Sequence, residues 1–173
     1  MTGIYIHECY PHLFPNPQEI YCAKQVILEE NLVLPCNKPD IESLSDVHTN
    51  PFIEGHQLIK NPVGQKLFIE GRVEQEILYV ANTPCQPVHA AHFVVPFCTF
   101  IDLPPSCISH FSNESFAPKI LVEFIQAKMD GARTIRKCMI LFIWCPIIHP
   151  VIPTPRPCSS GRRISCSKGK NGR

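Results

Sequence analysis

The chain has 173 residues and a mass of 19.6 kDa, which leaves room for one domain with extended ends and excludes two full domains. Its 18 prolines disfavour long helices, because proline has no backbone N–H to donate within a helix. Six of the 16 basic residues lie in residues 156–173, so the net charge of +1 combines an acidic body with a basic tail, and this distribution argues against a nucleic-acid-binding protein.

The first 23 residues are predicted to form an extended arm. Pro11, Pro15 and Pro17 stand there among aromatic residues and histidines, a composition that favours irregular chain. The apolar side chains of residues 4–6 could add a strand to a neighbouring sheet. The arm lacks the basic and apolar regions of a secretory signal, and no apolar run of the chain is long enough to span a bilayer, so we expect neither export by that route nor a membrane-spanning helix.

Two strands and one short helix are predicted next. The apolar segment Lys24–Leu34 indicates a strand that stops at Pro35. The segment Asp40–Val47 carries apolar residues three positions apart and is the one segment with a helical pattern. Residues 66–80 alternate between apolar and charged side chains, which indicates a half-buried strand, and Gly71 in its middle suggests a β-bulge.

The second half of the chain predicts three further strands. Residues 93–103 repeat the period of two, and Pro96 on the opposite parity indicates an edge strand or a kink. The segments Ile120–Met129 and Thr134–Cys145 flank the turn sequence Asp130-Gly131, which predicts a β-hairpin. Its second arm is almost wholly apolar and is therefore expected to be a central strand.

These elements predict a mainly β protein with non-local strand pairing, either a single antiparallel β-sandwich or a small barrel. The β domain is expected over residues 24–148, after the arm at 1–23. A Pro-rich, basic, cysteine-containing tail is expected at 149–173 and predicted to be disordered.

Four segments in this order resemble the SPOCS domain family of sporulation and spore coat proteins, as in SipL. They are Lys66–Gly71 (KLFIEG), Ile77–Val80 (ILYV), Gln86–Phe93 (QPVHAAHF) and Val95–Pro104 (VPFCTFIDLP). The upstream Pro39–Leu44 is similar to the lead-in of the family, so the resemblance covers roughly residues 24–145. The chain differs from larger members in its high cysteine count, its single copy of the domain and the lack of a recognisable peptidoglycan-binding module.

The resemblance implies a spore coat or exosporium context, with protein partners and no catalysis. Such a protein would be made in the mother-cell cytoplasm and deposited on the surface layers of the spore. Its partners would be other coat or exosporium proteins and the chain itself, as a homo-oligomer or polymer. This setting accounts for ten cysteines in a chain without an export signal, because the thiols would meet oxidant after lysis of the mother cell.

The cysteines fall into two predicted classes. Cys138 and Cys145 lie in the apolar strand and are expected to be small buried side chains. Cys98 lies opposite the core parity of its strand and would either pair or face a partner. Six others lie in predicted arms, turns or tail, where two chains can bring sulfurs together, and are the candidates for disulfide cross-links: Cys9, Cys22, Cys36, Cys85, Cys158 and Cys166.

A zinc-stabilised adaptor module is the alternative interpretation. Thiolate and imidazole are the preferred ligands of zinc, and the candidate ligands are Cys85, His89, His92 and Cys107, with His110 as another possible fourth ligand. Residues 89 and 92 point to opposite faces of an extended strand, however, and the chain has no Cys-x2-Cys pair. The sequence has no nucleophile elbow, phosphate-binding glycine loop or dinucleotide fingerprint, so we expect neither a cofactor nor an enzyme.

Overall fold

A computed structural model of the chain describes residues 4–104 and 112–146. It contains seven strands and three short 3-10 helices in these described residues. Their bounds are β1 Ile4–Glu8, η1 Pro11–Leu13, η2 Pro17–Glu19, β2 Ile20–Val33, β3 Ile41–Asn61, β4 Gly64–Ala81, β5 Val88–Asp102, η4 Asn113–Ser115, β6 Lys119–Met129 and β7 Thr134–Pro146.

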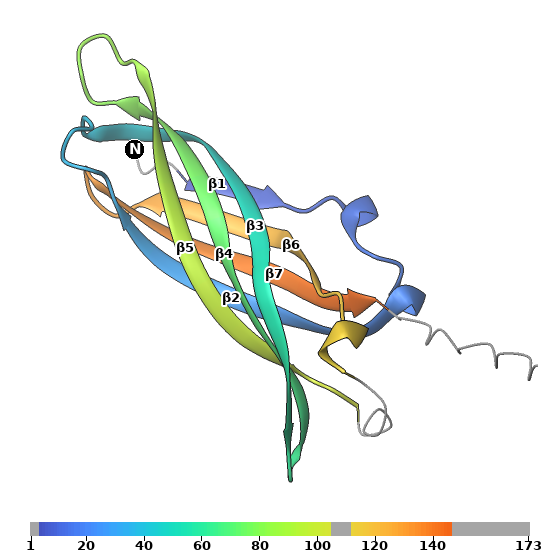
Figure 1. The fold of residues 1–173 in the computed structure, drawn as a ribbon. Coiled ribbons are helices and arrows are strands. Elements are labelled where there is room, and N and C mark those ends of the chain that lie inside the picture. Colours follow the sequence, from blue (N-terminus) through green and yellow to red (C-terminus); the bar gives the residue numbers. More distant parts are fainter. Residues whose placement is uncertain (1–3, 105–111, 147–173) are drawn as a thin grey trace, which may run out of the picture.

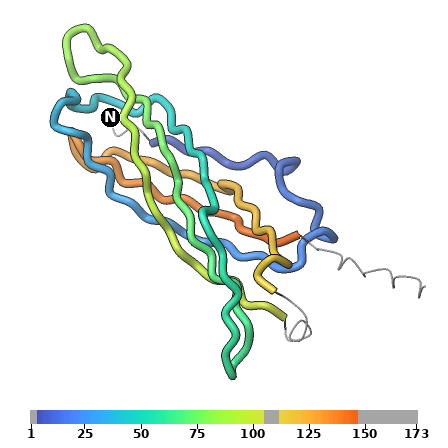
Figure 2. Tube along the Cα trace, in the orientation of Figure 1, coloured from blue at the N-terminus to red at the C-terminus, as the bar shows by residue number. Residues whose placement is uncertain are grey.

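The strands form two antiparallel sheets that pack face to face (Figure 1). The first, sheet A, has the order β1-β6-β7-β2, and the second, sheet B, has the order β3-β4-β5. Strands β3 to β5 cross over sheet A, and the β3–β4 hairpin extends beyond it (Figure 2). The mainly β, antiparallel prediction is confirmed, and of the two predicted architectures the sandwich is the one formed.

The core lies between the sheets and follows the alternation predicted for residues 66–80. The inward side chains of β4 are fully buried, namely Leu67, Ile69, Val73, Ile77 and Tyr79. They face the inward side chains of β7, of which Ile135, Met139, Leu141 and Ile143 are also fully buried. Burial of each such side chain stabilises the fold by about 1.5–3 kcal/mol. The pattern in the sequence therefore identified the inner face of the sandwich correctly.

The helix predicted at Asp40–Val47 is wrong, because this segment is the first part of strand β3. Irregularities in the pairing with β4 lie between Ile41 and Ser43 and between Leu44 and Asp46. Each extra residue shifts the alternation of the strand by one position. As a result, Leu44 packs against the core between the buried Ile41 and Val47, three residues from each, a spacing that a regular strand would not give.

Two further predictions are confirmed with small changes. The hairpin forms from β6 and β7, but residues 130–133 make a four-residue connection, closed by a bond from the Asp130 N–H to the Thr134 carbonyl oxygen (2.8 Å). Strand β7 is central, between β6 and β2. The predicted arm at 1–23 and the predicted start of the β domain at residue 24 need correction, because Ile4–Glu8 pairs with β6 of the same chain and residues 20–23 belong to β2. The predicted tail at 149–173 lies outside the described residues.

A charged pair is buried in this apolar core. Lys137 points inward from β7 with no exposed surface, and its Nζ lies 3.1 Å from Oε2 of Glu30, the residue opposite on β2. Gln75 of β4 completes the cluster across the two sheets, because its Nε2 donates to the same Glu30 oxygen at 2.9 Å while its Oε1 accepts from Lys137. Burial lowers the pKa of Lys137, and the attraction of Glu30 opposes this shift.

The lowered pKa of Lys137 predicts a rise in stability at alkaline pH. Between this lowered value and the unfolded value of 10.5, the unfolded chain holds the proton more often than the folded chain does, so the free energy of unfolding increases with pH. A Lys137→Met/Glu30→Gln variant lacks both charges, so its free energy of unfolding should not show this increase with pH. Urea unfolding of both proteins from neutral pH to about 10 would measure how the free energy of unfolding changes with pH. If the difference in this free energy between the two proteins did not change with pH, the prediction would be wrong.

Candidate interaction surfaces

The two sheets present four edge strands, of which β2 is the least protected. Strand β1 has only five residues, β3 contains Pro51 and three irregularities, and β5 contains Pro96. Short length, bulges and proline all discourage the addition of a further strand. Strand β2 has 14 residues without proline or glycine, and its one irregularity lies at its start, between Ile20 and Cys22. Pro96 on an edge strand confirms what the sequence indicated.

The outward side chains of β2 are partly apolar. Ile27 in the middle of the strand is 65% exposed. Lys24 lies closer to sheet B, where its Nζ donates to the Phe100 carbonyl oxygen at 2.8 Å and stands 4.1 Å from the centre of the Phe100 ring. This contact fixes the neighbouring edges of the two sheets, β2 and β5, relative to each other.

The outer face of sheet A carries a group of apolar side chains, which we call the outer apolar patch. Its members come from β2, β6 and β7, and the strand register places them in adjacent rows: Ile27, Leu121, Phe124, Ile140, Phe142 and Trp144. The rings of Phe142 and Trp144 stack with centroids 5.6 Å apart, and Phe14 lies 5.6 Å from Phe142. The patch reaches the β2 edge at Ile27, opposite Ile140.

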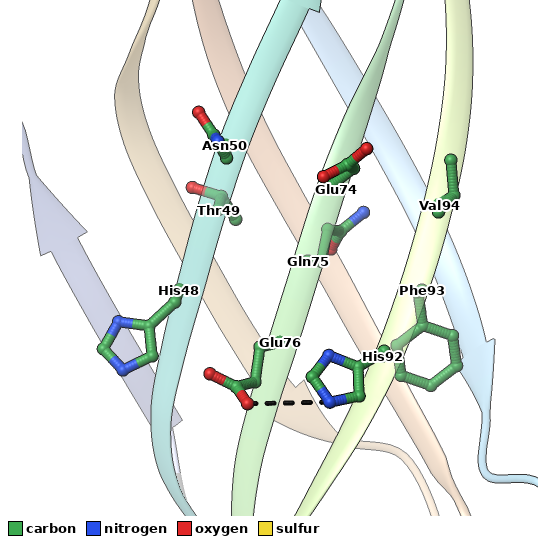
Figure 3. Close-up of a pocket in the computed structure, with 9 residues that line it drawn as sticks. All are labelled: His48, Thr49, Asn50, Glu74, Gln75, Glu76, His92, Phe93 and Val94. Carbon is green, nitrogen blue, oxygen red and sulfur yellow. Dashed lines mark ion pairs between the residues drawn. The ribbon is translucent and has the colours of Figure 1, made fainter.

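The outer face of sheet B holds an open groove of about 380 Å³ (Figure 3). Residues 48–50, 74–76 and 92–94 line it, three from each strand. Register places His48, Glu76 and His92 in one row across β3, β4 and β5. His92 Nε2 lies 3.6 Å from Glu76 Oε1, and His48 Nε2 lies 3.5 Å from Asp46 Oδ2. Both imidazoles are exposed, so the row presents polar side chains at the surface of sheet B.

The sequence placed Glu74 and Glu76 on the solvent side of their strand, and both are there. It did not find the two histidines beside Glu76, because the row forms only through pairing with β3 and β5. It also missed Lys137 and the outer apolar patch. The aromatic residues at alternate positions of β7, Phe142 and Trp144, were the available signal for the patch.

The candidate zinc ligands are not brought together in the described residues. Cys85 lies exposed in the β4–β5 connection, and His89 stacks on Tyr79 with ring centroids 5.8 Å apart. His92 lies on the opposite face of β5, beside Glu76. No group of three or more metal-binding side chains occurs in the part of the chain that is described. Cys107 and His110 lie outside it.

The cysteines predicted to form cross-links occupy different environments. Cys36 and Cys85 are exposed in connections between strands. Cys98 is also exposed, on the outer face of β5, and Cys9 is half-buried. Cys22 lies within β2 instead of an arm and is buried against the core. Of the two predicted buried cysteines, Cys145 is 1% exposed, whereas Cys138 is half-buried on the outer face of sheet A. Cys158 and Cys166 fall outside the described residues.

Within the described residues, no helix has the length and apolar character needed to cross a membrane.

Neither the curated proteins nor the solved structures gave a match to the chain. The family model described as SipL, SPOCS domain, matches residues 40–129, just over half of the chain. This match spans sheet B and all of β6 and indicates a role related to sporulation. The chain is a member of the SipL SPOCS-domain family.

Proposed function

We propose that this protein is a structural, non-catalytic component of the bacterial spore envelope, in the coat or exosporium, which assembles through β-edge contacts and cysteine cross-links. It is made in the mother-cell cytoplasm and deposited on the spore surface layers. Its partners are other envelope proteins and further copies of itself. Membership of the SPOCS-domain family supports the sporulation context.

The β2 edge carries this proposal. An edge strand of 14 residues presents a row of backbone N–H and C=O groups that a further strand can pair with. A strand added there would lie beside Ile27 and extend the outer apolar patch, so that backbone hydrogen bonds and apolar burial would act together. We therefore assign β2 as the surface at which a second copy docks.

Three exposed thiols support covalent locking of such an assembly. Cys36, Cys85 and Cys98 are all exposed, and they lie in the β2–β3 connection, in the β4–β5 connection and on β5. Their distribution over the molecule allows one chain to contact more than one neighbour. Disulfides between chains would then stabilise contacts that the β2 edge brings together.

Substitution Ile27→Lys is expected to weaken self-association roughly 10- to 100-fold. Burial of an isoleucine side chain contributes about 1.5–3 kcal/mol, and each 1.4 kcal/mol changes an equilibrium constant about tenfold. A lysine at this place also introduces a charge that opposes strand addition. Sedimentation of the reduced full chain over a range of concentrations would measure the effect.

The matched control is Val63→Lys, because Val63 is 94% exposed in the β3–β4 turn, away from β2. This variant should associate as the wild type does. If both lysine variants associate equally, the β2 edge is not the docking surface.

Oxidation of the protein is expected to give disulfide-linked multimers that reductant separates into single chains. Oxidised wild type should form a ladder on a non-reducing gel, and negative-stain images of the same sample should show fibres or sheets. A Cys36→Ser/Cys85→Ser/Cys98→Ser variant should form a much weaker ladder, because its described exposed thiols are gone. A single monomer band for oxidised wild type, with and without reductant, would refute covalent assembly.

A further inference from the structure

Two buried cysteines face each other across neighbouring strands of sheet A. Cys22 near the start of β2 pairs in register with Cys145 near the end of β7. Both side chains point into the sandwich and belong to its core, with exposed fractions of 9% and 1%. Neither thiol is bonded to another sulfur in the structure.

Directly opposed residues of antiparallel strands have Cα atoms about 4.5–5.5 Å apart. This separation falls within the roughly 4.4–6.8 Å that a disulfide spans. Because the two side chains are on the same face, their sulfurs can meet without a change in register. We propose that Cys22 and Cys145 form a disulfide within one chain when the folded protein meets a small-molecule disulfide such as oxidised glutathione.

The environment of the two thiols sets their order of reaction. Contact between the thiols lowers the pKa of Cys22, and the same contact together with burial raises the pKa of Cys145. Cys22 is also the more exposed of the two. Because a small oxidant reaches the more exposed thiol first, Cys22 attacks the oxidant and Cys145 is the resolving thiol.

The reaction proceeds by two exchanges. The Cys22 thiolate attacks one sulfur of the oxidant, which forms a mixed disulfide and releases one thiolate. The sulfur of Cys145 then attacks Sγ of Cys22, loses its proton to solvent and releases the second thiolate. In total, the two cysteines lose two electrons and two protons, and the oxidant is reduced to two small thiols.

This bond would join the start of β2 to the end of β7. Cys22 lies two residues after the first residue of β2, and Cys145 directly precedes the last residue of β7. The bond would anchor the β2 edge to the centre of sheet A without joining two chains. Its formation does not depend on the proposed self-association, and it would withdraw Cys22 from the cross-links that the sequence suggested.

Peptide mapping of the oxidised monomer band tests the linkage. After free thiols are alkylated, tryptic peptides 1–24 and 138–162 should appear linked, and reductant should separate them. Because these peptides also contain Cys9, Cys138 and Cys158, the decisive sample is the full chain with all three changed to serine. The link should persist there and be lost when Cys22→Ser is added. Alkylation of both Cys22 and Cys145 after oxidation of the triple variant would overturn the proposal.

Thermal unfolding gives a second measurement. Closing a chain segment of more than 100 residues should raise the midpoint of the oxidised triple variant by on the order of 10 °C over its reduced form. The midpoint should not respond to reductant in the Cys22→Ser variant. A linked peptide pair that is found only in multimer bands would assign the bond to the contact between chains and reject the intrachain disulfide.

Discussion

Replacement of Glu30 by glutamine is expected to destabilise the fold by about 3–5 kcal/mol. Glutamine has nearly the same shape as glutamate but removes the negative charge that lies 3.1 Å from Lys137 Nζ. The lysine would then keep a charge in the core without an opposite charge, or lose its proton at a cost in free energy. Either outcome lowers the free energy of unfolding, which urea titration at neutral pH would measure.

Two controls separate this charge effect from a general effect of the substitution. Glu29→Gln changes the exposed neighbour on the same strand and should leave the stability within about 0.5 kcal/mol of the wild type. The double variant Glu30→Gln/Lys137→Met removes both charges and should recover most of the loss, because a buried ion pair is often close to neutral in net stability. A stability loss below about 1 kcal/mol in Glu30→Gln would show that the ion pair is not required.

The buried cluster also helps to define how the sheets meet. Glu30 and Lys137 belong to sheet A, whereas Gln75 belongs to sheet B and bonds to both. A shift of one sheet over the other would separate Gln75 from both charges and leave its buried amide without partners, at about 1–3 kcal/mol. Apolar contacts tolerate such shifts far better, so this cluster contributes specificity to the packing of the sandwich.

The period of two in the sequence predicted the strands well where pairing is regular. The inward residues of β4 and β5, such as Leu67 and Ile101, could be assigned because each alternation runs without interruption. The same reasoning failed at Ile41–Val47, because bulges in β3 change the side-chain parity and imitate a helical spacing. Irregular pairing depends on the partner strand, which the local sequence does not contain.

The candidate sites were harder to predict for a related reason. Cys22 and Cys145 are far apart in sequence, and their contact follows from the pairing of β2 with β7. Lys137 stands among the inward side chains of β7, which are otherwise apolar, and the position of Glu30 opposite explains why a charge is tolerated there. The choice of β2 as the open edge likewise required the order of strands in both sheets.

Substitution Gly71→Ala is expected to cost about 3 kcal/mol, at the upper end of the range for overpacking. Gly71 is a buried residue of β4, opposite Phe97 of β5. A Cβ at this position would overlap the carbonyl oxygen of Phe52 and lie 2.7 Å from Cζ of the Phe97 ring. The aromatic ring has little space to move within the core, and the Phe52 oxygen belongs to the backbone of β3.

The close approach at Gly71 also explains the irregularity that the sequence suggested. The pairing shift lies in β3, between Ile53 and Gly55, and not in β4 itself. Gly71 allows the backbone of β3 to approach at this bend while the Phe97 ring covers the glycine. An added methyl group would therefore push β3 or β5 away from β4 and weaken sheet B at its centre.

Gly131→Ala is the matched control, because a Cβ there would meet no atom within 4 Å. It should change the stability by no more than about 0.5 kcal/mol. Urea unfolding followed by circular dichroism would compare both variants with the wild type under reducing conditions, so that disulfides do not contribute. Equal stability of the two alanine variants would mean that β3 and β5 accommodate the methyl group, and that the close contact at Gly71 does not hold the centre of sheet B together.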